Sequence, residues 1–120
     1  MLNLDTHILV FAITDQLRPR EKALLSTQRW GISAIVLWEI ARLFELGRIE
    51  VDLEDPEVTQ VLSQVHLWPI DLSICQELRR LDFKGDPADE LIAATSIVHR
   101  AELVTRDRVI RKSTRVPLAT

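Results

Sequence analysis

Cysteine and glycine are scarce in this sequence, and no zinc-finger pattern is present. The single cysteine, Cys75, cannot form an internal disulfide, and no pair of cysteines or histidines has the spacing of a structural zinc site. We therefore expect a protein of a reducing compartment, the cytoplasm. Only three glycines occur in 120 residues, which argues against long linkers, and the length suits one globular domain over residues 1–120.

A membrane span and a broadly basic surface are also missing. Asp5 and His7 interrupt the apolar start of the chain, and no Lys or Arg precedes it, which is not the pattern of a signal peptide. Other apolar runs are far shorter than the roughly 20 residues that cross a bilayer, so we expect no membrane association. The formal net charge is −3. A polyanionic partner would therefore be held by a local patch or through a metal ion.

Short apolar strands alternate with helical segments along the chain. Strands are predicted at residues 1–4, 30–32, 67–70 and 103–105, with a further edge strand at 116–118. Helices are predicted from Thr6 onward, at residues 34–46, 56–65, 73–81 and 106–112, and in the segment that begins at Asp86. Because parallel strands need crossover connections, this order predicts an α/β fold, a three-layer α/β/α sandwich around a mostly parallel sheet.

Five acidic residues fall where such a sheet binds ligands, beyond the carboxyl ends of its strands. Asp5 follows the first strand, and Asp107 follows the strand at 103–105. Asp86 and Asp89 lie on the first turn of one predicted helix. Glu39 lies at the boundary of the apolar face of the 34–46 helix, where an unpaired acid is costly.

Each acid also has an ordinary structural explanation. Asp5 and Asp86 could be helix N-caps, Asp89 could complement the helix dipole, Glu39 could pair with the arginine one turn later, and Asp107 could be a turn residue. Together, however, carboxylates at one edge of a sheet would repel one another unless a cation neutralised them. The candidate ligands are all oxygens, which favours Mg²⁺ or Mn²⁺ over zinc. Such an ion can activate water to attack a phosphodiester.

Four segments together resemble the PIN domain, and more narrowly the VapC-type ribonuclease toxins of bacterial toxin–antitoxin pairs. They occur in the expected order and spacing over nearly the whole chain. The segments are LDTHILVFA at residues 4–12, ISAIVLWEIA at 32–41 followed by LGRI at 46–49, GDPADELIAATSIVH at 85–99, and LVTRDRVIR at 103–111.

The resemblance implies a metal-dependent endoribonuclease. Its acidic quartet maps onto Asp5, Glu39, Asp89 and Asp107, with Asp86 as an auxiliary acid, and it would bind Mg²⁺ or Mn²⁺ and support hydrolysis of RNA phosphodiester bonds. The resemblance also implies a five-stranded parallel sheet, a homodimer, and inhibition by a VapB-like antitoxin that occupies the active-site groove.

Several further residues have expected roles beside the quartet. Thr6 and Ser33 match small polar positions that could orient the acids or a metal-bound water. A basic stretch next to Asp107 could contact RNA phosphates or could simply be a solvated helix face. This stretch contains Arg106, Arg108, Arg111 and Lys112. Glu90 directly follows Asp89, and at this position close relatives in the family usually carry a basic residue.

Two other functions fit parts of the sequence. A catalytically inactive PIN-fold module that binds RNA or protein would keep the fold without the chemistry. A phosphohydrolase or phosphoacceptor domain could use Asp5 at its strand end. The phosphatase class, however, wants a second aspartate where this chain has His7, and receiver domains need a lysine where this chain has Arg106 and Arg108. We therefore place the nuclease first.

Overall fold

The chain forms a parallel sheet covered by helices on both faces. The computed structural model describes all 120 residues. Its strands are β1 (Leu2–Leu4), β2 (Trp30–Ser33), β3 (His66–Trp68) and β4 (Glu102–Val104). Its helices are α1 (Thr6–Ile13), α2 (Pro19–Leu25), α3 (Ala34–Glu45), α4 (Pro56–Leu62), α5 (Leu72–Glu77), the 3₁₀ turn η1 (Leu78–Arg80), α6 (Pro87–His99) and α7 (Arg108–Arg111).

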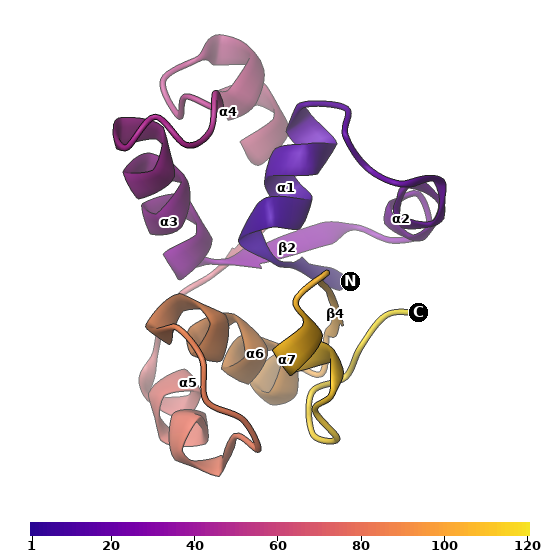
Figure 1. Cartoon of the computed structure of the whole chain (residues 1–120), viewed down its shortest axis with the longest axis vertical. Coiled ribbons are helices and arrows are strands. Elements are labelled where there is room, and N and C mark those ends of the chain that lie inside the picture. The colour runs from indigo at the N-terminus through magenta and orange to yellow at the C-terminus, as the bar shows by residue number, and fades with distance from the viewer.

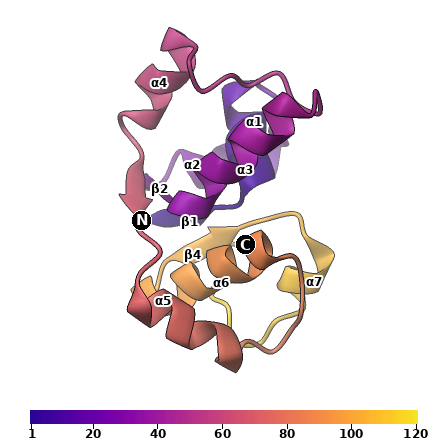
Figure 2. The same cartoon turned by 90° about the vertical axis from the view of Figure 1, so that its left-hand side faces the viewer.

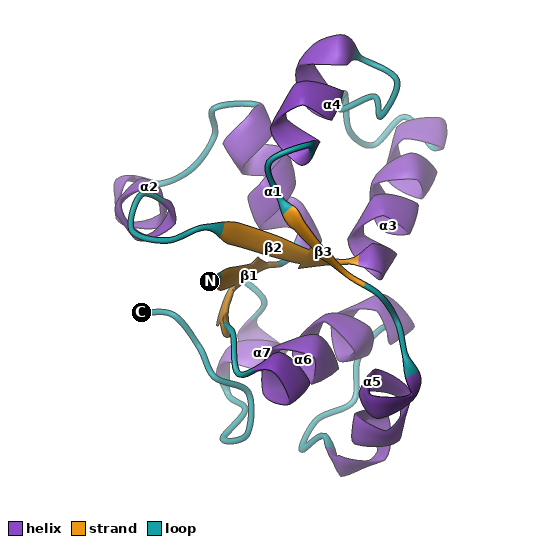
Figure 3. Ribbon diagram, turned by 180° about the vertical axis from the view of Figure 1, so that it is seen from behind, coloured by secondary structure: helices purple, strands orange, loops and turns teal.

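The strands are ordered β3-β2-β1-β4, and every neighbouring pair is parallel. Figures 1 and 2 show α1, α3 and α4 on one side of the sheet and α5 and α6 on the other. Seen from behind, the strands cross the middle of the molecule between these two groups (Figure 3). The predicted three-layer α/β sandwich is therefore confirmed.

The sheet has four strands and not the five that the family resemblance implied. The segment predicted as an edge strand, residues 116–118, makes only one isolated bridge, between Leu118 and Leu103. The Leu103 N–H donates to the Pro117 carbonyl at 2.8 Å, and the Ala119 N–H donates to the Leu103 carbonyl at 3.0 Å. Pro117 has no N–H of its own, so the ladder stops after this bridge.

The core lies between the central strand β1 and the two helical layers. Leu2 and Leu4 are fully buried, as expected for a parallel strand covered on both faces. Asn3 is the polar exception: its side-chain amide donates to the Ile92 carbonyl at 3.1 Å and to Ser96 Oγ at 2.9 Å, while its Oδ1 has no partner. These bonds tie β1 to α6 and so set where the start of α6 lies relative to the end of β1.

Several predicted helix ends were displaced by local capping. The 106–112 helix is shorter, Arg108–Arg111, because Asp107 is its N-cap. The 73–81 helix begins at Leu72 and changes to a 3₁₀ turn at Leu78. Gly47 follows α3 with a φ of 69°, as predicted for a helix end. Helix α2 was not predicted. No helix has the length and apolar character needed to span a membrane.

Candidate functional site

Five carboxylates line one cavity at the carboxyl edge of the sheet, and we call it the acidic cavity. Its volume is about 440 Å³. It is lined by Asp5, His7, Phe11, Glu39, Asp86, Asp89, Arg106 and Asp107. These residues come from the ends of β1 and β4 and from three helices, so the fold brings together all five acids that the sequence singled out.

Asp5 is the most deeply held of these acids. It is 6% exposed and is the N-cap of α1, where its Oδ1 accepts a hydrogen bond from the Thr6 N–H at 2.8 Å. Its Oδ2 accepts from the hydroxyl of Thr105 at 2.5 Å. Burial raises the pKa of Asp5, while these two hydrogen bonds oppose that shift. The capping role and the place in the cavity therefore belong to the same side chain.

Thr105 links the two acids at the strand ends, and sequence reasoning did not single it out. Its hydroxyl donates to Asp5 and accepts from the Asp107 N–H at 3.0 Å. Asp107 in turn caps α7, with its Oδ1 accepting from Val109 and Ile110 at 2.8 and 3.0 Å. Asp107 Oδ2 has no hydrogen-bond partner within the chain. The only signal for Thr105 in the sequence was its position directly after β4.

Glu39 is held from α1 and not by the arginine on its own helix. Its Oε1 accepts a hydrogen bond from the hydroxyl of Thr6, a buried side chain. Arg42, the alternative partner, lies 5.8 Å over the ring of Trp38. Burial, followed by the charge of Asp5, raises the pKa of Glu39. The ordinary explanation for Glu39, an ion pair within α3, is therefore wrong.

The side-chain carboxylates of the two aspartates at the start of α6 accept no hydrogen bond from the protein. Asp86 occupies the N-cap position of α6, yet its carboxylate caps none of the helix N–H groups. Asp89 is half-buried, and its pKa is raised to about 7, first by burial and then by the charges of Asp5, Asp107, Glu39 and Asp86. Both carboxylates are therefore free to bind a cation.

Two neighbouring residues take structural roles. Glu90 points back to the loop before α6, where its Oε2 accepts from the Gly85 N–H at 3.0 Å. Ser33 is fully buried and caps α3, with its Oγ accepting from the Ile35 N–H at 3.3 Å. Neither lines the acidic cavity. Glu90 therefore adds no acid to the cavity wall, and any effect of Ser33 on the acids would be indirect.

Arg106 is the only cation of the basic stretch that lines the acidic cavity, and its charge is already paired. Its Nε and Nη2 donate to the two carboxylate oxygens of Glu21 at 2.7 Å each, and the guanidinium lies 4.2 Å over the ring of Phe11. These bonds lower the pKa of Glu21 to about 2. Arg111 donates to the Thr105 carbonyl at 3.2 Å, whereas Arg108 and Lys112 are exposed.

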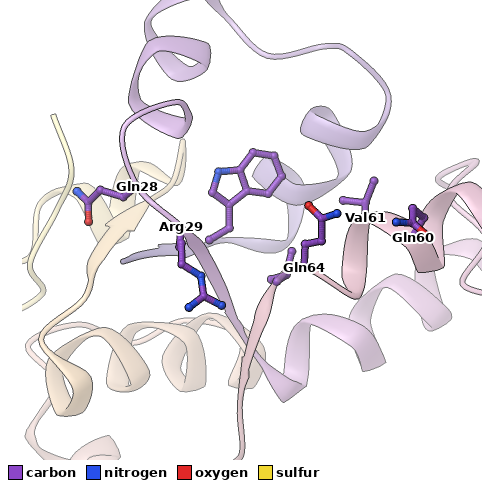
Figure 4. A pocket seen from close by; sticks show the side chains of 7 residues that line it. Gln28, Arg29, Gln60, Val61 and Gln64 are labelled. Carbon is purple, nitrogen blue, oxygen red and sulfur yellow. The ribbon is translucent and has the colours of Figure 1, made fainter.

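A larger cavity, about 700 Å³, lies away from these acids, at the opposite edge of the sheet. Trp30 begins β2 and Gln28 and Arg29 directly precede it, and the other lining residues come from α4 and the turn after it (Figure 4). It contains no carboxylate, thiol or imidazole. It therefore offers no acid, base or metal ligand for catalysis.

The acidic cavity suits a hard divalent cation by its donor chemistry. Its carboxylates supply only oxygen, and the one nitrogen ligand at hand is the exposed His7. No three of the carboxylate, imidazole or thiolate groups are preassembled around a single point. Mg²⁺ does not require such a cage, because it keeps several waters and binds through one or two carboxylates. The residues present therefore fit Mg²⁺ or Mn²⁺ better than zinc.

Comparisons with known proteins identify the family of the chain. The family model of the PIN domain matches residues 3–115. Ribonuclease VapC22 of Mycobacterium tuberculosis is 32% identical over 114 residues, which are 90% of this chain and 88% of that protein.

Two solved structures share the fold. A toxin-antitoxin complex from Klebsiella pneumoniae has a TM-score of 0.74 and 22% identity, covering 100% of this chain and 97% of the other. VapBC2 from Rickettsia felis, bound to a DNA fragment from its promoter, has a TM-score of 0.74 and 21% identity, covering 99% and 98%. At this level of identity the two structures show similarity of fold alone.

Proposed function

Since this chain belongs to the PIN domain family, we propose that it is a metal-dependent endoribonuclease toxin of the VapC kind. The observation that carries the proposal is the acidic cavity. Five carboxylates from four segments of the chain line it, and the one guanidinium in its wall is paired with Glu21. Nothing in the chain neutralises these acids, and a divalent cation would.

The acids divide into those that are fixed and those that are free. Asp5 is fixed by Thr105, and Glu39 is fixed by Thr6. Asp89 and the unpaired oxygen of Asp107 are free to turn toward an ion, with Asp86 as an auxiliary ligand. We assign Mg²⁺ or Mn²⁺ to these residues. When bound, such an ion polarises a phosphoryl oxygen and lowers the pKa of its water.

The proposed partners follow from the relatives. A ribonuclease is 32% identical to this chain, and toxin–antitoxin complexes are among the solved structures that share its fold. For this chain we propose RNA as substrate, a VapB-like antitoxin as inhibitor, and a homodimer. Beside the acids an apolar surface includes Trp38, which is 58% exposed, and Pro87. An inhibitor that covers the acids could bury this surface at the same time.

The test is hydrolysis of RNA by purified protein in Mn²⁺ or Mg²⁺. Wild type should cleave, chelator should stop the reaction, and Asp107→Asn should lower the rate by roughly 100-fold or more, because the metal supplies several kcal/mol of transition-state stabilisation. Glu90→Gln is the matched control, since Glu90 is an acid of α6 outside the cavity. Cleavage by wild type and Asp107→Asn at equal rates would refute the assignment.

The inactive RNA-binding or protein-interaction module remains as the second outcome. Such a protein would bind RNA with an affinity that chelator does not change. It would also show no cleavage in either metal. The carboxylates without hydrogen-bond partners favour the enzyme, because an inert module would gain stability by replacing them with neutral side chains.

A further inference from the structure

A second cavity adjoins the acidic one, and its charge has the opposite sign. We call it the basic cavity; its volume is about 250 Å³. It is lined by Arg18, Arg20, Glu21, Leu24, Val104, Thr105, Arg106, Arg111, Ala119 and Thr120. Arg106 lines both cavities, so its side chain forms the wall between them. Figure 1 shows α2 and the C-terminal end of the chain on the same side of the molecule.

Most of the positive charge in the basic cavity is free. Four guanidinium groups face a single side-chain carboxylate, that of Glu21, and both oxygens of Glu21 are engaged by one edge of the Arg106 guanidinium. Arg111 gives one hydrogen bond to a backbone carbonyl, which leaves its charge uncompensated. Arg18 and Arg20 are exposed and form no ion pair.

This local excess contrasts with the charge of the whole chain, which is −3. Guanidinium groups match phosphate oxygens in geometry as well as charge. The cavity has no aromatic side chain on which a base could stack, and its apolar lining consists of Leu24, Val104 and Ala119. Recognition here would therefore be of a phosphate and not of a base.

We propose that the basic cavity binds a backbone phosphate of the RNA strand whose scissile phosphodiester lies in the acidic cavity. This inference rests on the proposed function. The five carboxylates repel an RNA strand, and the positive charge of the basic cavity directly beside them offsets that repulsion. The proposal also separates the basic residues by role. Arg111 lines the basic cavity together with Arg18 and Arg20 of the α2 segment, whereas Arg108 and Lys112 lie outside it.

The experiment measures how RNA binding depends on salt. A fluorescein-labelled 20-nucleotide single-stranded RNA is titrated by anisotropy in EDTA, which prevents cleavage, over a series of KCl concentrations. The double variant Arg18→Gln/Arg20→Gln should flatten the slope of log Kd against log [KCl] by about 0.7, because the loss of one phosphate contact removes about 0.7 on single strands. Arg18→Lys/Arg20→Lys should retain most of the slope.

The matched control is Arg29→Gln/Arg79→Gln. It removes the same charge from two exposed arginines that line neither the acidic nor the basic cavity, and its slope should equal that of wild type. A competition arm adds inorganic phosphate at constant ionic strength. Phosphate should weaken RNA binding to wild type more than to the glutamine double variant, because both ligands would use the same arginines; if phosphate binds wild type without weakening the RNA, the cavity is a site for free phosphate and the inference fails.

Cleavage in Mn²⁺ separates this inference from the proposed function. Because it removes two arginines of the basic cavity, Arg18→Gln/Arg20→Gln should raise KM about tenfold and leave kcat unchanged. The phosphate site is refuted if wild type cleaves RNA but the glutamine double variant and the Arg29→Gln/Arg79→Gln control have the same salt slope, or if no protein binds RNA. If RNA binds with the expected loss of slope but is not cleaved in any metal, the nuclease is refuted and the phosphate site is retained.

Discussion

Arg106 lies between the carboxylate of Glu21 and the carboxylates of the acidic cavity, and the pKa shifts on its two sides are opposite in direction. Glu21 is buried and forms a two-point ion pair, and its pKa falls to about 2. Asp89 is half-buried among other acids, and its pKa rises to about 7. Burial raises the pKa in both cases; at Glu21 the hydrogen bonds from Arg106 outweigh it, whereas at Asp89 the charges of the other acids add to it. The ion pair of Glu21 therefore stabilises the fold, whereas the charge of Asp89 lowers its stability when no cation is bound.

The largest effect is expected from substituting Asp89, whose carboxylate has no hydrogen-bond partner in the chain. Asp89→Asn should reduce metal-dependent RNA cleavage by roughly 100-fold or more, since it withdraws a proposed ligand. In EDTA the same substitution should raise the free energy of unfolding by about 1 kcal/mol, because it removes repulsion from four neighbouring carboxylates. Cleavage assays and urea denaturation measure the two effects.

Glu90→Gln is again the control, as the next residue on the same helix turn. It should leave cleavage within about twofold of wild type and should not stabilise the protein, because Glu90 bonds the Gly85 N–H outside the cavity. If Asp89→Asn were less stable than wild type in EDTA, this would contradict the claim that repulsion among these acids lowers the stability of the fold.

Metal addition should offset that cost in the wild-type protein. At a Mn²⁺ concentration of 100 times Kd, binding to the folded state alone adds about 2.7 kcal/mol to the free energy of unfolding. We expect Tm to rise with Mn²⁺ and to return to its starting value with chelator, as followed by calorimetry. Asp89→Asn should show a much smaller rise. An equal rise in both proteins would place the ion elsewhere.

The paired acid should respond in the opposite direction. Glu21→Gln leaves the guanidinium of Arg106, which is 27% exposed, without its carboxylate, and we expect a loss of about 2 kcal/mol in the free energy of unfolding. Lys22→Gln is a suitable control, because Lys22 is in the same helix and its ion pair with Asp15 is exposed.

The pH dependence of stability gives a second test of Glu21. Its pKa is lowered from 4.5 to about 2 in the folded state, so the stabilisation is present above pH 4.5 and is lost as the pH falls toward 2. Wild type should therefore lose stability over this range, and Glu21→Gln should lose about 2 kcal/mol less. Parallel curves for the two proteins would contradict the ion pair as the cause.

The sequence predicted the layered architecture, and it predicted that five acids lie together at the carboxyl edge of the sheet, because both follow from the order of strands and helices. The role of these acids as metal ligands stays a prediction. Alternation of apolar strands with helices was sufficient for the layers, and the resemblance drawn from four segments is confirmed over residues 3–115. The prediction of a fifth strand was wrong because Pro117 has no N–H to donate to the strand ladder. Thr105 and the Glu21–Arg106 pair were missed because they join residues 100 and 85 positions apart, which no spacing in the sequence encodes.

Thr105→Val should give the smallest effect and tests how the cavity is held together. The substitution keeps the shape but removes the hydroxyl that donates to Asp5 and accepts from the Asp107 N–H. We expect a loss of about 1 kcal/mol in the free energy of unfolding, and cleavage about tenfold lower because the two acids are no longer held in register. Thr105→Ser, which retains the hydroxyl, should restore most of the cleavage. If Thr105→Val cleaves RNA as fast as wild type, the acids are positioned by their helix caps alone, and the link between β4 and β1 serves only stability.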